Sequence, residues 1–344
     1  MRALVLGGVR DIIVADHPDP VLEGSDEAIV RVEAAGLCGS DLHPYLGREP
    51  AAPGVVAGHE AVGEIVAVGS GVRGFETGDR VIVPFTASCG RCPACASGLT
   101  ARCARSQLFG WGDRDDTARR LDGCQAELVR IPLASSTLVR CPDVSASHAV
   151  LLADNLPTAW EAFDRTRYRD GTLAVVGLGS VGLCAVALAT SMGVTDVVAF
   201  DPVAMRAAIA ESLGARIVDQ STVTEIGATA VIEAAGNAPA QRMALALTRP
   251  GARISMISVQ TDDSFAITPV EAYDQNLTLS LGRASVRSTL EERLADLSAV
   301  DRRSVSAIVD RPGLPLSEGP ETYRAFADRR FVKATFHPRS VGSR

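Results

Sequence analysis

Four side chains able to take part in metal or proton chemistry fall within the short stretch Gly36–His43. They are the thiol of Cys38, the hydroxyl of Ser40, the carboxylate of Asp41 and the imidazole of His43. A cysteine thiolate is a common zinc ligand, and a neighbouring hydroxyl can pass a proton onward. A buried free cysteine in a polar turn is an equally good interpretation of the stretch alone, because free cysteine behaves as a small apolar residue. The metal hypothesis therefore requires further ligands elsewhere in the chain.

A second group of possible ligands consists of four cysteines, Cys89, Cys92, Cys95 and Cys103. Thiols at this spacing can close a tetrahedral shell around zinc, and four protein ligands leave no open position, so this site is expected to be structural. Chance clustering, a disulfide pair and a nucleic-acid-binding zinc ribbon are the alternatives. The acidic balance of the chain and the lack of a basic flank argue against the ribbon.

A glycine-rich turn supplies the features of a nucleotide site. The sequence Gly177-Leu-Gly179-Ser-Val-Gly182 follows an apolar strand-like run and precedes a helix-like run. In such a turn the first glycine permits the tight bend, the second lets backbone approach a pyrophosphate, and the third lets helix and strand pack closely. The helix N-terminus then faces the phosphates.

Asp201 falls at the end of the next expected strand. A carboxylate there accepts hydrogen bonds from the ribose of NAD and repels the 2′-phosphate of NADP, so NAD is the expected cofactor. Arg206 lies one helical turn further on, where it would contact the adenosine side or remain a solvated surface arginine.

Two kinds of fold are needed to position these groups. The N-terminal part shows short strands and glycine-rich turns, which predict a compact, largely antiparallel barrel. Ser145 or Ser147 is then expected to cap a helix through Ala149–Phe163, after which apolar strands alternate with helices, as in a parallel sheet covered on both faces. The predicted domains are residues 1–150 together with 290–344, and residues 151–289.

Composition excludes several classes of function. The chain has 344 residues, a formal net charge of −7 and 4% aromatic residues, so it lacks the basic surplus and the stacking platforms of a nucleic-acid binder. The uncharged stretch Leu173–Val194 is long enough to span a bilayer. Its glycines instead favour a buried strand, turn and helix, and with no secretory signal visible a cytoplasmic protein without membrane contact is expected.

In chain order these motifs match one known family. Gly58-His59-Glu60, with Gly63, Gly69 and Val72 following, adds a histidine where a second ligand is needed. With the other motifs, the chain resembles the zinc-dependent medium-chain alcohol dehydrogenases over essentially its whole length. The resemblance implies an α/β protein with a GroES-like antiparallel β-barrel catalytic domain and a Rossmann doubly wound parallel sheet. It also implies NAD, one catalytic and one structural zinc per chain, an alcohol or carbonyl substrate, and a homodimer or homotetramer.

The resemblance assigns the ligands of the catalytic zinc. Cys38 and His59 match two of them, and the third falls at Asp154, where many relatives have cysteine and a bacterial subset has aspartate. Thiolate and carboxylate together still neutralise the metal charge. Glu60 matches a glutamate that can approach the metal in this family.

The resemblance also assigns proton transfer and cofactor contacts. Asp41 matches the carboxylate that orients the histidine ligand, and Ser40 and His43 match a proton relay. Residues near the cofactor are matched more loosely: Thr158 and Val181 near the nicotinamide, and Lys333 near the pyrophosphate.

The match loosens in the connection between Ile217–Val218 and Ala230–Glu233. Relatives usually place a crossover helix there, and parallel strands need a connection of a dozen or more residues. The chain is therefore expected to lack that helix and to cover one face of its sheet thinly. The remaining cysteines lack ligand spacing and are expected in the core: Cys124, Cys141 and Cys184. Three histidines are expected to be structural or exposed: His17, His148 and His337.

Substrate-pocket residues carry no motif. Phe85 and Trp160 are candidates for pocket walls and Tyr45 for a third, with core packing the alternative for each. The Arg- and Asp-rich segment Arg105–Asp122 around Trp111 is expected to be either a loop over the substrate or a solvated charged loop.

Three functions are compatible with these residues. The first is an NAD-dependent zinc dehydrogenase acting on a primary or secondary alcohol or a polyol. The second is a biosynthetic enzyme that uses the same scaffold and zinc for a non-redox elimination. The third is a non-catalytic zinc-binding interaction protein, against which the complete set of relay residues argues.

Overall fold

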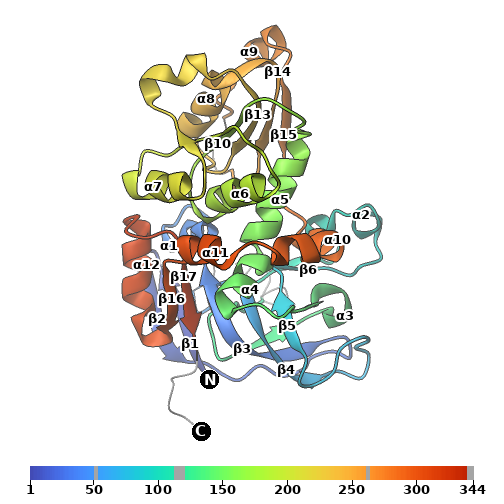
Figure 1. Ribbon diagram of the computed structural model, residues 1–344. Helices are drawn as coiled ribbons and strands as arrows, with labels where there is room; N and C mark the ends of the chain where they lie inside the picture. Colours follow the sequence, from blue (N-terminus) through green and yellow to red (C-terminus); the bar gives the residue numbers. More distant parts are fainter. Residues whose placement is uncertain (50–52, 112–120, 261–263, 339–344) are drawn as a thin grey trace. The chain divides into compact units, whose positions relative to one another are not determined.

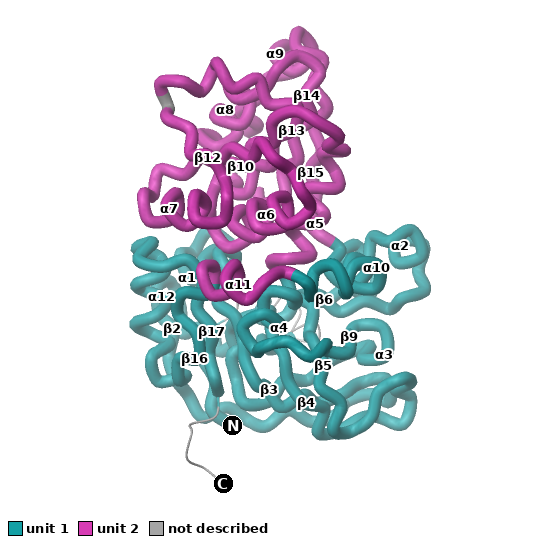
Figure 2. Tube along the Cα trace, in the orientation of Figure 1, with its two compact units in different colours: residues 1–154, 285–299, 309–344 teal, residues 155–284, 300–308 magenta. Residues whose placement is uncertain are grey.

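The computed structural model describes residues 1–49, 53–111, 121–260 and 264–338, which form two compact units (Figures 1 and 2). Unit 1 contains residues 1–154, 285–299 and 309–344, and unit 2 contains residues 155–284 and 300–308. The sequence-based boundaries placed residues 151–154 and 285–289 in the second domain and 300–308 in the first; in the structure each segment lies in the other unit.

Unit 1 is built on a seven-stranded sheet with the order β16-β17-β3-β4-β5-β9, in which β8 also pairs with β3. All pairs are antiparallel except β16 with β17. In β3, Val30 and Val32 are buried while Arg31 and Glu33 are partly exposed, the alternation of a strand with one face on the core. The predicted antiparallel architecture is confirmed. The strands are β3 (Ala28–Leu37), β4 (Ala61–Val68), β5 (Arg80–Val83), β8 (Leu128–Ile131), β9 (Val139–Arg140), β16 (Arg311–Pro315) and β17 (Ala334–His337).

Smaller elements complete unit 1. They are β1 (Arg2–Gly8), β2 (Asp11–Asp16), η1 (Gly39–Asp41), α1 (Leu42–Tyr45), β6 (Thr86–Ala87), α2 (Pro93–Ala96), η2 (Thr100–Arg102), β7 (Gln107–Leu108), α3 (Ala134–Thr137), α4 (Ala146–Ala153), α10 (Val286–Ser298), η5 (Leu316–Glu318) and α12 (Gly319–Ala327).

Neighbouring strand ends bring the chemistry-bearing loops of unit 1 together. β3 ends one residue before Cys38, and β4 begins one residue after Glu60. Gly36 N–H donates to the carbonyl of Glu60 at 2.9 Å, which fixes these two loops side by side. On the other side of β3, Leu37 pairs with Ala334 of β17. Lys333, the residue before Ala334, therefore lies at the same end of the sheet as these two loops.

The helix predicted through Ala149–Phe163 is interrupted. Ser145 caps α4 by accepting from the His148 N–H at 3.3 Å, as the sequence predicted. The helix then ends at Asp154, whose backbone angles (φ −154°, ψ −65°) are not helical, and α5 (Asn155–Thr166) begins at the next residue. The prediction of one continuous helix was wrong, and the interruption turns out to place Asp154 in the cluster described below.

Unit 2 is a six-stranded parallel sheet with the order β12-β11-β10-β13-β14-β15 (Figure 1), which confirms the predicted doubly wound arrangement. In β10, Ala174 and Val176 share a core cluster with residues of α8, while Val175 approaches Gly182 of α6. Both faces of β10 are therefore covered, which explains its continuous apolar sequence. The strands are β10 (Leu173–Val176), β11 (Val197–Phe200), β12 (Arg216–Ile217), β13 (Ala228–Glu233), β14 (Thr248–Met256) and β15 (Thr278–Leu281). The helices are α5, α6 (Ser180–Ser191), α7 (Ala204–Ser212), α8 (Ala238–Ala246), α9 (Pro269–Asp274) and α11 (Arg302–Ile308).

Unit 2 contains both the uncharged stretch Leu173–Val194 and the short connection that follows β12. The uncharged stretch Leu173–Val194 forms β10, the glycine turn and α6, and no helix within the described residues is long and apolar enough to cross a membrane. The connection after β12 contains a 3₁₀ helix, η4 (Gln220–Glu225), in place of an α-helix. Its Val223 and the following Ile226 pack into the core, so this short turn covers part of the sheet that a full helix would cover.

Candidate active site

Cys38, His59, Glu60 and Asp154 form a buried cluster in unit 1. One donor atom from each lies within 4.8 Å of the donor atoms of the other three. The Cys38 Sγ lies 3.4 Å from Oδ2 of Asp154, and the His59 Nε2 lies 3.7 Å from the same oxygen. The four residues are 6%, 3%, 0% and 7% exposed in the order named. Sulfur, nitrogen and oxygen donors converging in a buried site are a ligand set suited to zinc.

Asp41 orients this cluster. Its Oδ1 lies 2.8 Å from Nδ1 of His59, and its Oδ2 accepts the backbone N–H of Cys38 at 2.8 Å. When His59 donates its Nδ1 proton to Asp41 and binds a metal as a neutral imidazole, its lone pair would be on Nε2, the nitrogen that faces Asp154. One carboxylate thus fixes the imidazole tautomer and the backbone of the cysteine.

Burial and close contact shift the pKa values of the candidate ligands. Burial lowers the pKa of His59, but the Asp41 charge and hydrogen bonds to Asp154 and Asp41 outweigh it, so the pKa lies well above its usual value. Burial raises the pKa of Asp154, yet the hydrogen bond and charge of His59 bring it below its usual value. Burial raises the pKa of the Cys38 thiol. The shifts of His59 and Asp154 show that positive charge is favoured among these buried groups. A divalent cation would supply that charge.

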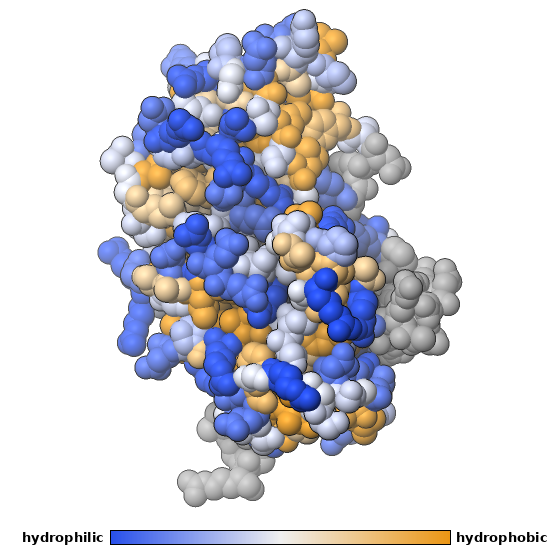
Figure 3. Space-filling view, turned by 90° about the vertical axis from the view of Figure 1, so that its right-hand side faces the viewer, coloured by the Kyte–Doolittle hydropathy of each residue, from blue (hydrophilic) through white to orange (hydrophobic). Residues whose placement is uncertain are grey.

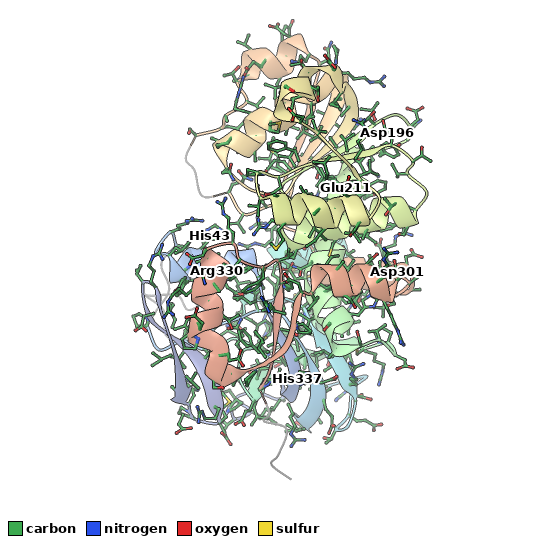
Figure 4. The ribbon with its side chains drawn as sticks, turned by 60° about the vertical axis from the view of Figure 1, so that its left-hand side comes forward. His43, Asp196, Glu211, Asp301, Arg330 and His337 are labelled. Atoms are coloured by element: carbon green, nitrogen blue, oxygen red, sulfur yellow. The ribbon has the colours of Figure 1, made fainter. Side chains whose placement is uncertain are left out.

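Ser40 and His43, the predicted relay, lie in the consecutive elements η1 and α1. Ser40 follows Cys38 in η1, and its Oγ lies 3.2 Å from Nε2 of His59. His43 stands on α1, and Figure 4 labels it. Its Nδ1 is buried with no hydrogen-bond partner within the described part of the chain, and burial lowers its pKa. Ser40 therefore contacts the cluster directly, whereas no direct hydrogen bond joins it to His43 among the described contacts.

The four cysteines of the second cluster also converge. The Sγ atoms of Cys89, Cys92, Cys95 and Cys103 lie within 4.8 Å of one another, and all four are free thiols. Cys103 Sγ accepts backbone N–H groups from Cys89 at 3.2 Å and Arg105 at 3.3 Å. Hydrogen bonds from the backbone N–H groups of Cys95 and Ala104 lower the pKa of Cys92 to about 6. Donors aimed at sulfur favour thiolates, the form that binds zinc.

The glycine turn in unit 2 has the geometry its sequence predicts. Gly177 has φ +87°, and a Cβ added at Gly182 would lie 1.9 Å from the Gly177 carbonyl oxygen. A Cβ at Gly179 would meet no heavy atom within 4 Å, so this position is open to a ligand. Gly179 is also the N-cap residue of α6. Of the looser assignments, Thr158 is buried on α5 and Val181 partly buried on α6.

Asp201 follows β11 and faces the glycine turn. Its Oδ2 accepts the Leu178 N–H at 2.7 Å, and its Oδ1 accepts the Val203 N–H at 2.8 Å. Arg206 lies close by, with Nη1 3.8 Å from Oδ2 of Asp201, and its side chain is 17% exposed. Arg206 is therefore an ion-pair neighbour of Asp201 and not a fully solvated surface arginine.

Known protein families match parts of both units. The alcohol dehydrogenase GroES-like domain matches residues 24–143, and the zinc-binding dehydrogenase domain matches residues 180–299. The zinc-type alcohol dehydrogenase B of Aspergillus flavus is 36% identical over 356 residues, which cover 98% of this chain and 81% of that protein. The chain belongs to the zinc-dependent medium-chain dehydrogenase family.

Solved structures of dehydrogenases resemble this chain over nearly its full length. The alcohol dehydrogenase TADH from Thermus sp. ATN1 has a TM-score of 0.89 and 34% identity, covering 98% of this chain and 99% of that one. A zinc-binding dehydrogenase from Sinorhizobium meliloti 1021, bound to NADP, has a TM-score of 0.82 and 28% identity with the same coverage. The antiparallel unit 1 is thus the GroES-like part of a medium-chain dehydrogenase, and unit 2 its Rossmann-like part.

Lys333 lies in a different environment from the one expected of it. The resemblance placed it near a pyrophosphate, but its side chain is 0% exposed and its ammonium donates to Oε2 of Glu60. Burial raises the pKa of Glu60 to about 7, although the Lys333 charge acts in the opposite direction. The lysine is therefore an interior partner of the candidate metal cluster.

The aromatic candidates divide between the site and the core. Phe85 meets the His59 ring edge-on at 6.2 Å between centroids, and Trp111 lies 5.9 Å from the same ring. Tyr45 is 3% exposed and packs against Tyr323 at 5.3 Å, so it is a core residue and not a pocket wall. Trp160 is partly buried on α5. Residues 112–120 of the charged loop expected around Trp111 lie outside the described residues.

Sequence reasoning missed two residues that support the dehydrogenase site. Gln125 is fully buried, and its Nε2 donates to the carbonyl of Gly36 at 2.8 Å. The hydroxyl of Tyr323 in turn donates to Oε1 of Gln125 at 2.8 Å. This chain of hydrogen bonds holds the end of β3 next to Cys38. Neither residue belongs to a local motif, so no signal in the sequence marks them.

Proposed function

We propose that this chain oxidises an alcohol, primary, secondary or polyol, to the aldehyde or ketone by hydride transfer to NAD, and catalyses the reverse reaction. The observation that carries the proposal is the buried Cys38, His59 and Asp154 set oriented by Asp41. The family membership supports an oxidoreductase. A sorbitol dehydrogenase of Bacillus subtilis, 31% identical over 78% of this chain, adds support for hydroxylated substrates.

Metal binding and proton transfer are assigned to separate residues of the site. Cys38, His59 and Asp154 would hold a zinc ion, which supplies Lewis acidity to a substrate hydroxyl while NAD supplies the hydride acceptor. The Ser40 hydroxyl lies 3.2 Å from Nε2 of His59 and is assigned as the first acceptor of the substrate proton. His43 is assigned as the next acceptor, because burial keeps it neutral and its Nδ1 has no hydrogen-bond partner among the described residues.

NAD is preferred to NADP in this proposal because of Asp201. Two backbone N–H groups fix its carboxylate at the end of β11, where it can accept from ribose hydroxyls and repel a 2′-phosphate. The NADP-bound structure of the Sinorhizobium meliloti relative makes NADP the alternative to be measured.

The test combines metal analysis with an alcohol panel assayed with NAD and NADP separately. We expect two zinc ions per chain, one for each cluster, and formation of NADH. Cys38→Ala should retain one zinc and lose the activity. A chain that binds both metals yet never transfers hydride, and instead eliminates water from a hydroxylated substrate, would favour the non-redox alternative.

Self-association is part of the same proposal. β15 ends the order of the described parallel strands, and Leu281 on it is 51% exposed, while Val270 and Tyr273 on α9 are 67% and 82% exposed. Figure 3 shows hydrophobic residues gathered on the face of unit 2 turned to the viewer. An unpaired strand edge beside apolar side chains suits pairing with a second copy. Light scattering should give a dimer or tetramer, and Leu281→Lys should shift it toward monomer.

A further inference from the structure

Glu233 is a buried carboxylate at the carboxyl end of β13 in unit 2. The residue is 0% exposed, and its Oε1 accepts the backbone N–H groups of Ala235 and Gly236, each at 2.7 Å. The Ser258 hydroxyl donates to Oε2 at 3.2 Å, and Nε2 of Gln260 donates to the same oxygen at 3.5 Å. One side chain therefore joins the loop that follows β13 to the loop that follows β14.

The charge of Glu233 has no counter-ion in its surroundings. Within the part of the chain that the structure describes, its partners are neutral N–H and O–H groups, and no lysine, arginine or histidine pairs with it. Burial raises the pKa of this carboxyl, and the hydrogen bonds act in the opposite direction. Four donors directed at two oxygens satisfy an ionised carboxylate. Because a buried charge without a counter-ion costs stability, its presence calls for a role in ligand binding.

The place of Glu233 in the sheet puts this charge beside the expected cofactor site. Glu233 pairs in register with Val176 of β10, and the strand order of the described sheet reverses between β10 and β13. Dinucleotides bind outside the carboxyl ends of parallel strands at such a reversal. The loop after β13 also adjoins the glycine turn, because a Cβ added at Gly177 would lie 2.7 Å from the Cβ of Ala235.

The two halves of the sheet are assigned to different halves of the cofactor. The glycine turn after β10 and Asp201 after β11 lie in the half formed by β10, β11 and β12, and they are assigned to the pyrophosphate and the adenosine ribose. Each half of a doubly wound sheet binds one mononucleotide, so the nicotinamide mononucleotide is assigned to the half that contains β13. The oxidised nicotinamide ring is positively charged and the reduced ring is neutral. A negative charge beside this half therefore acts on one redox state.

We propose that Glu233 determines which redox state of the cofactor is preferred: its buried carboxylate attracts the positively charged ring of NAD⁺ and leaves the affinity for NADH unchanged. The inference rests on the proposed function for the identity of the cofactor as a nicotinamide dinucleotide. Attraction between charges acts over several ångströms and is strengthened by the low dielectric constant of a protein interior, so it needs no direct contact. The same charge lowers the reduction potential of the bound cofactor, because it stabilises the oxidised form.

The experiment measures the dissociation constants of NAD⁺ and NADH for the full chain, by NADH fluorescence and by competition. Glu233→Gln keeps an oxygen for the two backbone N–H groups and removes the charge. We expect the ratio of the NAD⁺ constant to the NADH constant to rise by about threefold or more. Glu211→Gln, which removes an exposed carboxylate on α7 of the same unit, should leave the ratio unchanged.

A second pair of variants changes the charge without altering Glu233. Gln260→Lys brings an ammonium group to a position whose side chain already reaches the carboxylate, so the ratio should rise as in Glu233→Gln. Gln260→Met removes the same hydrogen bonds without adding a charge and should keep the parent ratio. This pair decides the question if Glu233→Gln does not fold.

The proposal fails if Glu233→Gln weakens NAD⁺ and NADH equally, as a purely structural role of the two loops predicts, or changes neither. It also fails if Gln260→Lys and Gln260→Met give the same ratio. If the parent binds NADP⁺ and NADPH instead, the ratio is measured with that pair, and only the preference for NAD is wrong. A parent that binds neither pair would overturn both proposals. If the ratios behave as expected while no alcohol is oxidised, the proposed function fails and the role of Glu233 stands.

Discussion

Asp41 and His59 are joined by a hydrogen bond of 2.8 Å between Oδ1 and Nδ1, inside a cluster from which water is almost excluded. We expect Asp41→Asn to weaken the catalytic metal by about 10- to 100-fold, the usual effect of losing the partner of a ligating histidine. Chelator competition measures this. The four-cysteine metal should be unaffected, and an unchanged catalytic-metal affinity would contradict the orienting role.

The glycine turn permits a matched pair of substitutions. Gly182→Ala would place its Cβ 1.9 Å from a backbone oxygen, so we expect it to lower the free energy of unfolding by at least about 2 kcal/mol. Gly179→Ala has open space and φ −70°, so the fold should persist while NADH affinity falls about tenfold, equivalent to about 1.4 kcal/mol. Thermal melts and NADH titration separate the two. Equal stability of the variants would argue against the close helix–strand contact.

Cofactor preference should depend on the charge of Asp201. Asp201→Asn removes the repulsion of a 2′-phosphate and leaves Arg206 nearby, so the ratio of NADP to NAD efficiency should rise about tenfold. Asp219→Asn is the control, since this aspartate also accepts a backbone N–H, from Ser221, in the same unit. No change in the Asp201 variant would remove the basis for preferring NAD.

The four-cysteine cluster should be structural. Cys92→Ser should remove one metal per chain, leave the catalytic metal, and lower Tm by about 5 °C or more, because metal binding is coupled to folding. Cys141→Ser, which changes a cysteine outside both clusters, should keep both metals. Loss of both metals in Cys92→Ser would mean that the clusters do not fill independently.

His148 should make stability depend on pH. Burial lowers its pKa below the ordinary 6.5, although the Leu297 carbonyl, 3.0 Å from Nε2, opposes the shift. The unfolded chain therefore binds the proton first, so this contribution is complete above pH 6.5 and is lost as the pH falls toward the folded pKa. Between pH 7.5 and 5.5 the parent should lose more stability in urea than His148→Gln. Parallel losses would refute the assignment.

Local patterns predicted most of the individual elements, and their failures are informative. The glycine turn, the cysteine spacing and the strand at Leu173–Val176 depend on neighbouring residues, so the sequence contains the reason for each. The helix predicted through Ala149–Phe163 was wrong at Asp154, where the chain leaves helical geometry; Pro157 lies in the first turn of α5, the only part of a helix that tolerates proline, and was the local signal for a new start. The contact between Lys333 and Glu60 was not predicted, because the two residues lie far apart in the chain.

By itself the sequence determined which chemical groups and local elements this protein has: thiols, an imidazole and carboxylates at metal-ligand positions, a phosphate-binding turn, and alternating strands and helices. Tertiary structure decided which of these groups meet. The antiparallel pairing of β3 with β4 and β17 brings Cys38, Glu60 and Lys333 to one edge, and the end of α4 adds Asp154. Coordination and ion pairing act over a few ångströms in space, and separation along the chain contains no information about that distance until the sheet has formed.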